Sequence, residues 1–249
     1  MDNLTPKHNN ENNTEKIRLQ VYLARSGIGS RRTCEQYICE GRVSVNGQIV
    51  TEQGIKVSNN DSVKFDGKIC TPVRSNVYLA LNKPVKYLCT NSDPEGRPLA
   101  KELLTGINVR VFHVGRLDFL SSGLILYTND GEFAKIASHP SSGIEKEYEV
   151  QGTLPITDAM LQDFKSGIIE NGEKLRIKKY YRHSAHRVRL VLVEGKNREI
   201  RRVFKLYNIP LKYIQRTRIG SIELGKLPKG HYRHLSEREI YSIYKRKRK

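Results

Sequence analysis

The 249-residue sequence predicts an α+β fold, with a small first domain and a larger second domain built on a mostly antiparallel mixed sheet. Strand patterns outnumber helical ones and do not alternate with them regularly, which argues against a doubly wound sheet. A short polar stretch at 71–76 separates two regions of different pattern. We therefore expect one domain at 17–72 and a second at 77–241.

The two ends of the chain differ from these domains in composition. Residues 1–16 are rich in Asn and charged side chains, which is typical of a disordered tail. Residues 242–249 are expected to form a basic tail that ends in an unbroken Lys/Arg run. Such a run fits a solvated tail and a phosphate contact equally well.

Net charge gives the strongest indication of a partner. Lys and Arg number 44 against 26 Asp and Glu, so the formal net charge is +18. An excess of this size favours a polyanion, with nucleic acid ahead of an anionic membrane surface. The sequence contains no run of about 18 apolar residues and no apolar segment behind a basic start. We expect no membrane association and a cytoplasmic location.

Residues 17–70 predict two short helices followed by strands. Ser30 is a good N-cap for the second helix, and Gly41 fits its C-terminal end. Asn46-Gly47 is a strong hairpin signal between two short apolar strands. A last strand is expected at 62–65.

The second region predicts a sheet with helices between its strands. Strand patterns are found at 77–84, 123–130, 146–152 and 187–195, and helical patterns at 130–138 and 198–207. The second of these helices combines an apolar face with several Arg and Lys residues.

Motifs for nucleotide or metal chemistry are missing from the sequence. It contains no phosphate-binding loop, no dinucleotide fingerprint, no G-x-S-x-G and no H-E-x-x-H. The four cysteines form no C-x-x-C pair, and the histidines show no metal-ligand spacing. We expect no cofactor, no metal and no small-molecule cosubstrate.

Three segments remain as candidates for chemistry. Asp118 lies two residues after Arg116 in a turn-rich stretch, a spacing that also fits a structural ion pair. Tyr148 lies in a period-two strand, where a Tyr is more often a packing residue. In the basic helix at 198–207, one Arg could hold a carboxylate while the others bind phosphates.

The first domain resembles the RNA-binding domain named after ribosomal protein S4. The matching stretch is LQVYLARSGIGSRRTCEQYICEGRVSVNGQIV, residues 19–50. In it Arg31 and Arg32 open a helix whose N-terminal amides also favour phosphate. The resemblance implies that these two residues contact RNA.

The second region resembles the RsuA/RluB-type family of pseudouridine synthases. The matching motifs, in chain order, are GRLD at 115–118, TNDG at 128–131, KEYEV at 146–150, EGKNREIRR at 194–202 and RTRIG at 216–220. With the first domain, the resemblance covers residues 16–241. Two positions depart mildly from the family pattern: Glu199 stands where Gln is common, and Lys196 where Arg is common.

The resemblance implies roles for individual residues. Asp118 matches the essential Asp, which acts either on C1′ as a nucleophile or on the C2′ proton as a base. Tyr148 matches the Tyr that stacks on the target uracil, and Arg201 matches the basic residue that pairs with the Asp. Arg116 matches an Arg that fills the gap left by the flipped uridine, and Ile214 an apolar wall under the base.

The remaining substrate contacts are expected from cations of the EGKNREIRR motif, with Lys196 and Arg198 as candidates for binding RNA. The implied activity is isomerisation of one uridine to pseudouridine in ribosomal RNA, 23S in preference to 16S, by a monomer that flips the base out. Two alternatives stay open from the residues alone. A non-catalytic RNA-binding or assembly factor fits the charge, and a nuclease or methyltransferase fits an RNA partner.

Overall fold

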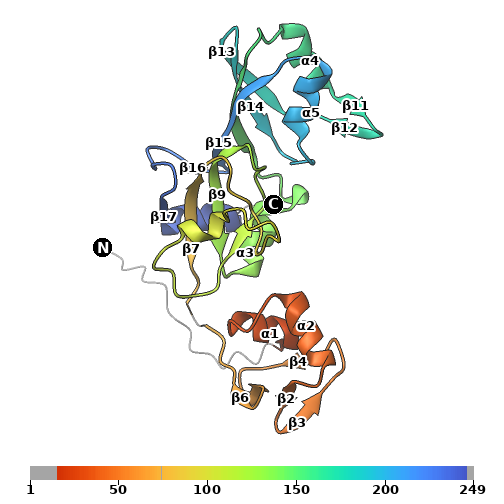
Figure 1. Cartoon of the computed structure of the whole chain (residues 1–249), viewed down its shortest axis with the longest axis vertical. Helices are drawn as coiled ribbons and strands as arrows, with labels where there is room; N and C mark the ends of the chain where they lie inside the picture. Colours follow the sequence, from red (N-terminus) through yellow and green to blue (C-terminus); the bar gives the residue numbers. More distant parts are fainter. Residues whose placement is uncertain (1–15, 74, 246–249) are drawn as a thin grey trace, which may run out of the picture. The chain divides into compact units, whose positions relative to one another are not determined.

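The structure, a computed structural model, describes residues 16–73 and 75–245. The chain divides into two compact units between Ser75 and Asn76, inside the polar stretch that separates the two expected domains. Both units mix helices and strands (Figure 1). The predicted α+β class is therefore confirmed. The expected tail at 1–16 lies outside the described residues except for Lys16.

The first unit packs two helices against short strands. Its elements are β1 (Ile17–Arg18), α1 (Leu19–Arg25), α2 (Arg31–Cys39), β2 (Val43–Val45), β3 (Gln48–Val50), β4 (Lys56–Val57), β5 (Val63–Phe65) and β6 (Lys68–Ile69). The order β3-β2-β5-β6 forms an antiparallel sheet, and β1 pairs with β4. Leu23 and Ile38 of the helices are buried against Val43 and Val63 of the sheet.

Local sequence signals determine the turns of this unit. The Ser30 hydroxyl accepts from the backbone N–H of Thr33 at 3.1 Å and so caps α2. Asn46 and Gly47 have φ values of 52° and 85°, the left-handed pair that a two-residue hairpin needs.

The second unit is built on a mixed sheet of nine strands. Its strands are β7 (Tyr78–Lys83), β8 (Phe112–Val114), β9 (Ser122–Thr128), β10 (Lys146–Gly152), β13 (Lys179–Ser184), β14 (Arg187–Leu192), β15 (Leu211–Ile219), β16 (Ile222–Glu223) and β17 (Tyr232–His234). The main order is β13-β14-β10-β15-β9-β7-β17, with β16 on β15 and β8 on β9. Within it only the β15–β9 pair is parallel. The sheet is therefore mostly antiparallel, as predicted.

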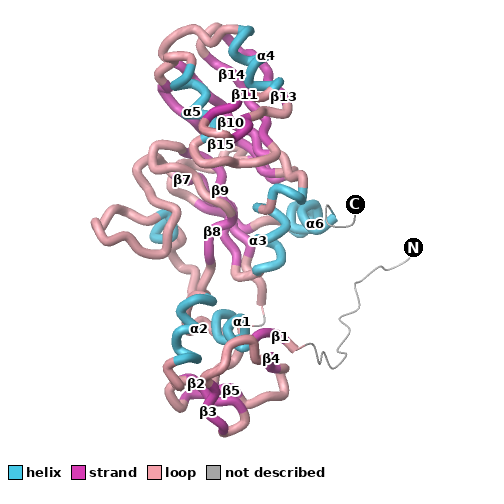
Figure 2. The backbone as a smooth tube through the Cα atoms, turned by 90° about the vertical axis from the view of Figure 1, so that its right-hand side faces the viewer, coloured by secondary structure: helices cyan, strands magenta, loops and turns pink. Residues whose placement is uncertain are grey.

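The helices of this unit cover the sheet in two groups. They are α3 (Gly131–Ser138), α4 (Asp158–Ser166), α5 (Glu199–Leu206) and α6 (Glu237–Lys245), with short 3₁₀ turns η1 (Ala100–Leu103) and η2 (Pro140–Ser142) and a separate hairpin of β11 (Ile168–Glu170) and β12 (Glu173–Leu175). Helices α4 and α5 lie on the part made by β10, β13 and β14 (Figure 1), and α3 lies beside α6 (Figure 2).

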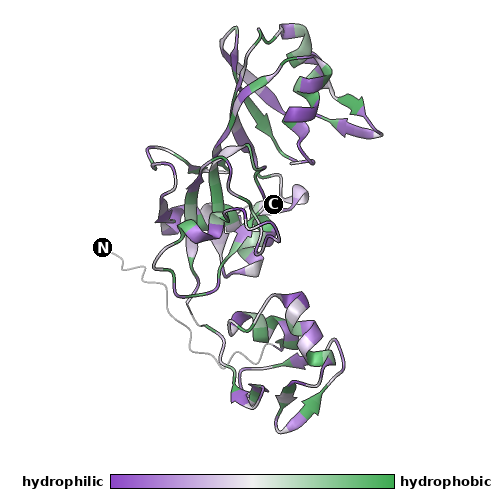
Figure 3. Ribbon diagram, in the orientation of Figure 1, coloured by the Kyte–Doolittle hydropathy of each residue, from purple (hydrophilic) through white to green (hydrophobic). Residues whose placement is uncertain are grey.

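Strand β9 runs through the middle of the hydrophobic core. All seven of its residues are buried, because Leu124 and Leu126 face one core while Ile125 and Tyr127 face the other. Figure 3 shows the green of hydrophobic residues along β9. A strand buried on both faces is a rigid support for the loop that precedes it.

The C-terminal boundary differs from the expected one. Residues 242–245, assigned to the basic tail, form the last turn of α6. Ile243 is only 1% exposed in the core, and the Tyr244 hydroxyl donates to Asp130, the N-cap of α3. The Lys/Arg content of the segment concealed these two anchors. Residues 246–249 lie outside the described part of the chain.

Candidate active site

Asp118 lies in the loop between β8 and β9. Its neighbour Leu117 is 7% exposed and packs into the core. The backbone N–H of Ser121 donates to the Asp118 carbonyl at 3.0 Å and closes the turn. The Asp118 side chain remains 37% exposed. The loop is therefore anchored on both sides of a carboxylate that solvent can reach.

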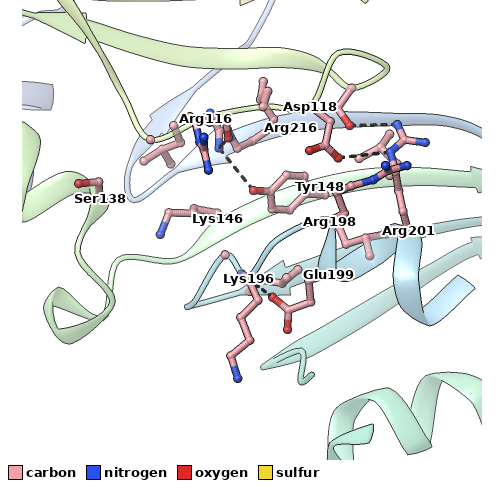
Figure 4. A pocket seen from close by; sticks show the side chains of 18 of the residues that line it. Arg116, Asp118, Ser138, Lys146, Tyr148, Lys196, Arg198, Glu199, Arg201 and Arg216 are labelled. Atoms are coloured by element: carbon pink, nitrogen blue, oxygen red, sulfur yellow. Dashed lines mark hydrogen bonds and ion pairs between the residues drawn. The ribbon is translucent and has the colours of Figure 1, made fainter. Parts of the chain in front are cut away.

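Arg201 of α5 faces this carboxylate across 83 residues of sequence. Its Nε donates to Asp118 Oδ2 at 3.3 Å, and its Nη2 donates to the Ser121 hydroxyl at 3.1 Å. Figure 4 shows the side chains of Asp118 and Arg201 pointing toward one another. The apolar face of α5, with Val203 and Phe204 fully buried, fixes the side of the helix on which Arg201 projects.

Tyr148 and Arg216 are paired across β10 and β15. The register shifts between Glu147 and Tyr148, so that Tyr148 stands opposite Arg216. Such a bulge re-aims side chains beside it. Arg216 is 2% exposed, and its Nη1 donates to the Tyr148 hydroxyl at 3.4 Å. Figure 4 shows this bond at the end of the Tyr148 ring that points away from Asp118.

The parallel contact of β9 with β15 depends on a glycine. Gly123 stands opposite Arg216 with φ 102°, and a Cβ there would lie 2.3 Å from the Arg216 carbonyl oxygen. Arg216 Nε in turn donates to the carbonyl of Leu124 at 2.6 Å. The absence of a side chain at Gly123 thus lets the strand that carries Arg216 approach the strand that follows the Asp118 loop.

These side chains share one cavity of about 300 Å³. The sequence-predicted residues that line it are Arg116, Asp118, Tyr148, Lys196, Arg198, Arg201 and Ile214. Arg31 and Arg32 belong to the other unit, where they are exposed in the first turn of α2. The structure thus brings seven of the nine predicted site residues together, while their individual roles stay predictions.

Ile214 forms an apolar part of the wall, since it is 3% exposed on β15. Arg116 and Arg198 are exposed at the rim. Arg198 has φ 47°, an uncommon value for a residue with a Cβ. Lys196 Nζ donates to the carbonyl of Lys174 at 2.5 Å, which ties this cation to the β12 hairpin.

Glu199 holds the turn that carries these rim cations. It is 4% exposed, and its carboxylate accepts from the backbone N–H groups of Lys196 at 3.1 Å and Arg176 at 3.0 Å. Burial raises the pKa of Glu199, and the two backbone donors oppose that effect. The carboxylate at this position therefore has a structural function in shaping the rim.

Sequence reasoning missed Ser121, Lys146 and Arg216 as parts of the site. Ser121 and Arg216 contact predicted residues directly, and Lys146 lines the same cavity. Two signals could have indicated Lys146: it opens the KEYEV motif, and it lies two residues before Tyr148, on the same face of a strand. Across residues 16–73 and 75–245, no group of three His, Cys, Asp or Glu residues could hold a metal ion. Within the same ranges, no helix is long and apolar enough to cross a membrane.

Comparison with known proteins identifies the family. Residues 77–206 match the model of the RNA pseudouridylate synthase family, and residues 17–63 match the S4 domain. The chain belongs to the RNA pseudouridylate synthase family. This confirms the predicted resemblance, and the protein is accordingly a pseudouridine synthase, an isomerase, with an N-terminal S4 domain.

Several relatives align with most of the synthase. An uncharacterized RNA pseudouridine synthase of Borreliella burgdorferi is 43% identical over 92% of this chain and 94% of its own length. The ribosomal large subunit pseudouridine synthase B of Pseudomonas aeruginosa is 35% identical over 90% of this chain and 60% of its own. The dual-specificity RNA pseudouridine synthase RluF of Escherichia coli is 35% identical over 92% and 79%. A crystal structure of a pseudouridylate synthase superposes with a TM-score of 0.67 at 27% identity, covering 91% of this chain and 99% of that one.

Proposed function

We propose that this synthase isomerises one specific uridine to pseudouridine in ribosomal RNA, 23S in preference to 16S, with Asp118 as the reacting carboxylate. The observation that supports it most is the Asp118–Arg201 ion pair of 3.3 Å at the wall of a cavity that Tyr148 also lines. A relative named for the ribosomal large subunit supports the substrate class.

The isomerisation requires a carboxylate that can reach the sugar of the target nucleotide. Either attack on C1′ or removal of the C2′ proton breaks the N1–C1′ bond. The uracil then turns and C5 bonds to C1′, while the Asp118 carboxylate leaves C1′ in the first route or returns the proton to C2′ in the second. C5 then loses its proton and N1 carries one. No electrons or groups are exchanged with a third molecule, so Asp118 and the groups around it suffice in this scheme.

The target uridine must leave its helix to enter the cavity. Its glycosidic carbon is inaccessible in a stacked strand, and extruding a nucleotide costs a few kcal/mol. The cations at the rim, Arg116 and Arg198, are exposed and placed to bind the strand around an extruded base. Tyr148 offers its ring for stacking, and Ile214 offers an apolar surface.

Tritium release tests this proposal. Transcripts of 23S and 16S rRNA carrying tritium at uridine C5 are incubated with the wild type and with Asp118→Asn. We expect release to water from the 23S transcript by the wild type and at least a ~10³-fold slower rate with the variant, at unchanged RNA affinity. No release from either transcript would contradict the proposed activity, whereas release from 16S alone would contradict only the preference for 23S.

Turnover that survives in Asp118→Asn would contradict the assignment of Asp118 as the reacting carboxylate. We also propose that the synthase acts as a monomer in the cytoplasm. Light scattering behind a sizing column tests the monomer, and fractionation of cells that produce the protein tests the location.

A further inference from the structure

Lys146 is a buried cation inside the cavity. It lies on β10 two residues before Tyr148, so both side chains point to the same face of the sheet. Lys146 is 9% exposed and lines the cavity, and its Nζ donates to the carbonyl of Val193 at 3.2 Å. An ammonium carries three N–H donors, so two remain for another acceptor.

No carboxylate within the described ranges forms an ion pair with Lys146. The acids that line the cavity are otherwise engaged, because Asp118 pairs with Arg201 and Glu199 accepts from backbone N–H groups. Burial and, to a smaller extent, the nearby guanidinium of Arg216 lower the pKa of Lys146 to about 8. A buried cation beside another cation is costly unless an anion joins them.

We propose that Lys146 binds a backbone phosphate of the substrate RNA, beside the nucleotide that Asp118 and Tyr148 receive. The inference rests on the proposed function and adds a phosphate subsite to it. Two residues along a strand span about 6.6 Å, so a phosphate attached to that nucleotide's ribose is within reach of Lys146. In Figure 4 the Lys146 side chain extends toward the Ser138 end of the cavity, away from Asp118.

A phosphate fits this site better than an uncharged group of the base does. Phosphate oxygens accept several donors and bring the negative charge that the buried ammonium lacks. Arg216 adds its positive charge close by, and its Nη2 has no hydrogen-bond partner within the described residues. The bound phosphate would therefore lie in a field made by two cations, held directly by Lys146.

The first experiment measures affinity against salt with the full-length protein. Lys146→Met keeps the aliphatic stem and removes the charge, Lys146→Arg keeps the charge, and Lys165→Met is the matched control. Lys165 is exposed on α4 and is not part of the cavity wall. Binding of the rRNA transcript is followed by fluorescence anisotropy at several KCl concentrations, and kcat by tritium release.

Lys146→Met should bind about tenfold more weakly, with a slope of log Kd against log salt reduced by roughly 0.7–0.9. Lys146→Arg should recover most of the affinity, because it keeps the positive charge. The Lys165→Met slope should match the wild type. An unchanged slope would show that Lys146 only ties β10 to Val193, and a large loss of kcat with an unchanged slope would assign it to the chemistry instead. Either result overturns the proposal.

A chemical double-mutant cycle keeps the test valid if Lys146→Met folds poorly. Neutral methylphosphonate linkages are placed in turn at the phosphates that flank the modified uridine, which leaves the protein unaltered. One of these neutral linkages should weaken binding to the wild type about tenfold. The same linkage should have little further effect on binding to Lys146→Met, or to Lys146→Gln if the Met variant does not fold. If every neutral linkage weakened binding equally in the wild type and in the Lys146 variant, the proposed phosphate subsite would be contradicted. Absence of turnover on any RNA counts against the proposed function alone, since the salt slope requires only binding.

Discussion

In the S4 domain, Arg31 and Arg32 stand exposed in the first turn of α2, whereas in the synthase domain Arg216 and Lys146 are 2% and 9% exposed. The two pairs carry the same charge in different surroundings. Exposed cations attract a polyanion at long range, and salt screens them. Buried cations are held in one geometry and can orient a reacting group or a single phosphate. The comparison separates long-range attraction of the RNA from the fixed positioning of single groups within one chain.

Arg201→Met is expected to have the largest effect of the variants considered next. Arg201 bonds Asp118 and Ser121, so its loss frees the carboxylate from its fixed position. A misplacement of about 1 Å at a reacting group can cost ~10² in rate. We expect kcat to fall about 10²-fold or more in the tritium assay, with little change in RNA affinity.

The neighbouring Arg202 provides the control for this variant. It pairs with Glu170 and Glu173 and lies outside the cavity wall, so Arg202→Met should retain activity within a few-fold. Equal losses in the two variants would mean that α5 responds as a whole and that the Arg201–Asp118 pair has no special function.

The sequence predicted more of the S4 domain than of the active site in the synthase domain. The helix cap at Ser30 and the Asn46-Gly47 hairpin depend on neighbours a few residues away, so local patterns predicted both. The Asp118–Arg201 pair spans 83 residues, and only the order of family motifs suggested it. No local rule joins two residues at that separation.

Arg216 shows why part of the site was not predicted. It occupies a core-facing position of β15, where a strand pattern calls for an apolar residue, so the alternation that would have indicated this strand is broken. Its contact with Tyr148 depends on a register shift between β10 and β15, and the approach of its strand depends on Gly123. Both features arise from pairing between distant segments, and a pattern within a single segment does not show them.

The double variant Arg31→Gln/Arg32→Gln tests the exposed side of the comparison and should have an intermediate effect. Each lost phosphate contact should lower the salt slope by roughly 0.7–0.9, and together they should weaken RNA binding about tenfold at moderate salt. The kcat at saturating RNA should not change, because neither residue lines the cavity. Anisotropy titrations at several KCl concentrations and single-turnover rates measure the two quantities.

Arg42→Gln is the matched control in the same domain. Its charge is already paired with Asp66 at 2.6 Å, so removing it should change the slope less than removing Arg31 and Arg32. If Arg42→Gln lowered the slope as much as the double variant, general charge would explain the affinity and the first turn of α2 would have no special function.

Glu199→Gln should have the smallest effect of these variants, and its effect is on stability. It replaces a buried carboxylate that lies among the cations of the cavity rim. Burial raises the folded-state pKa of Glu199 above its unfolded value. A carboxyl with a raised pKa contributes stability that is fully present below the unfolded pKa, about 4.3, and is lost as pH rises through the folded value. The wild type should therefore gain stability relative to Glu199→Gln as pH falls from 7 toward 4.5.

The expected change is a few degrees in the Tm difference between wild type and Glu199→Gln, measured by calorimetry across this pH range. Glu223→Gln, an exposed carboxylate on β16 of the same unit, corrects for the removal of one negative charge from a cation-rich chain. If instead the wild type lost stability relative to Glu199→Gln as the pH falls, the backbone N–H donors of Lys196 and Arg176 would have a larger effect on the pKa of Glu199 than burial has. In that case the rim turn would be stabilised by a charged Glu199 at neutral pH, and Gln would be the weaker residue there.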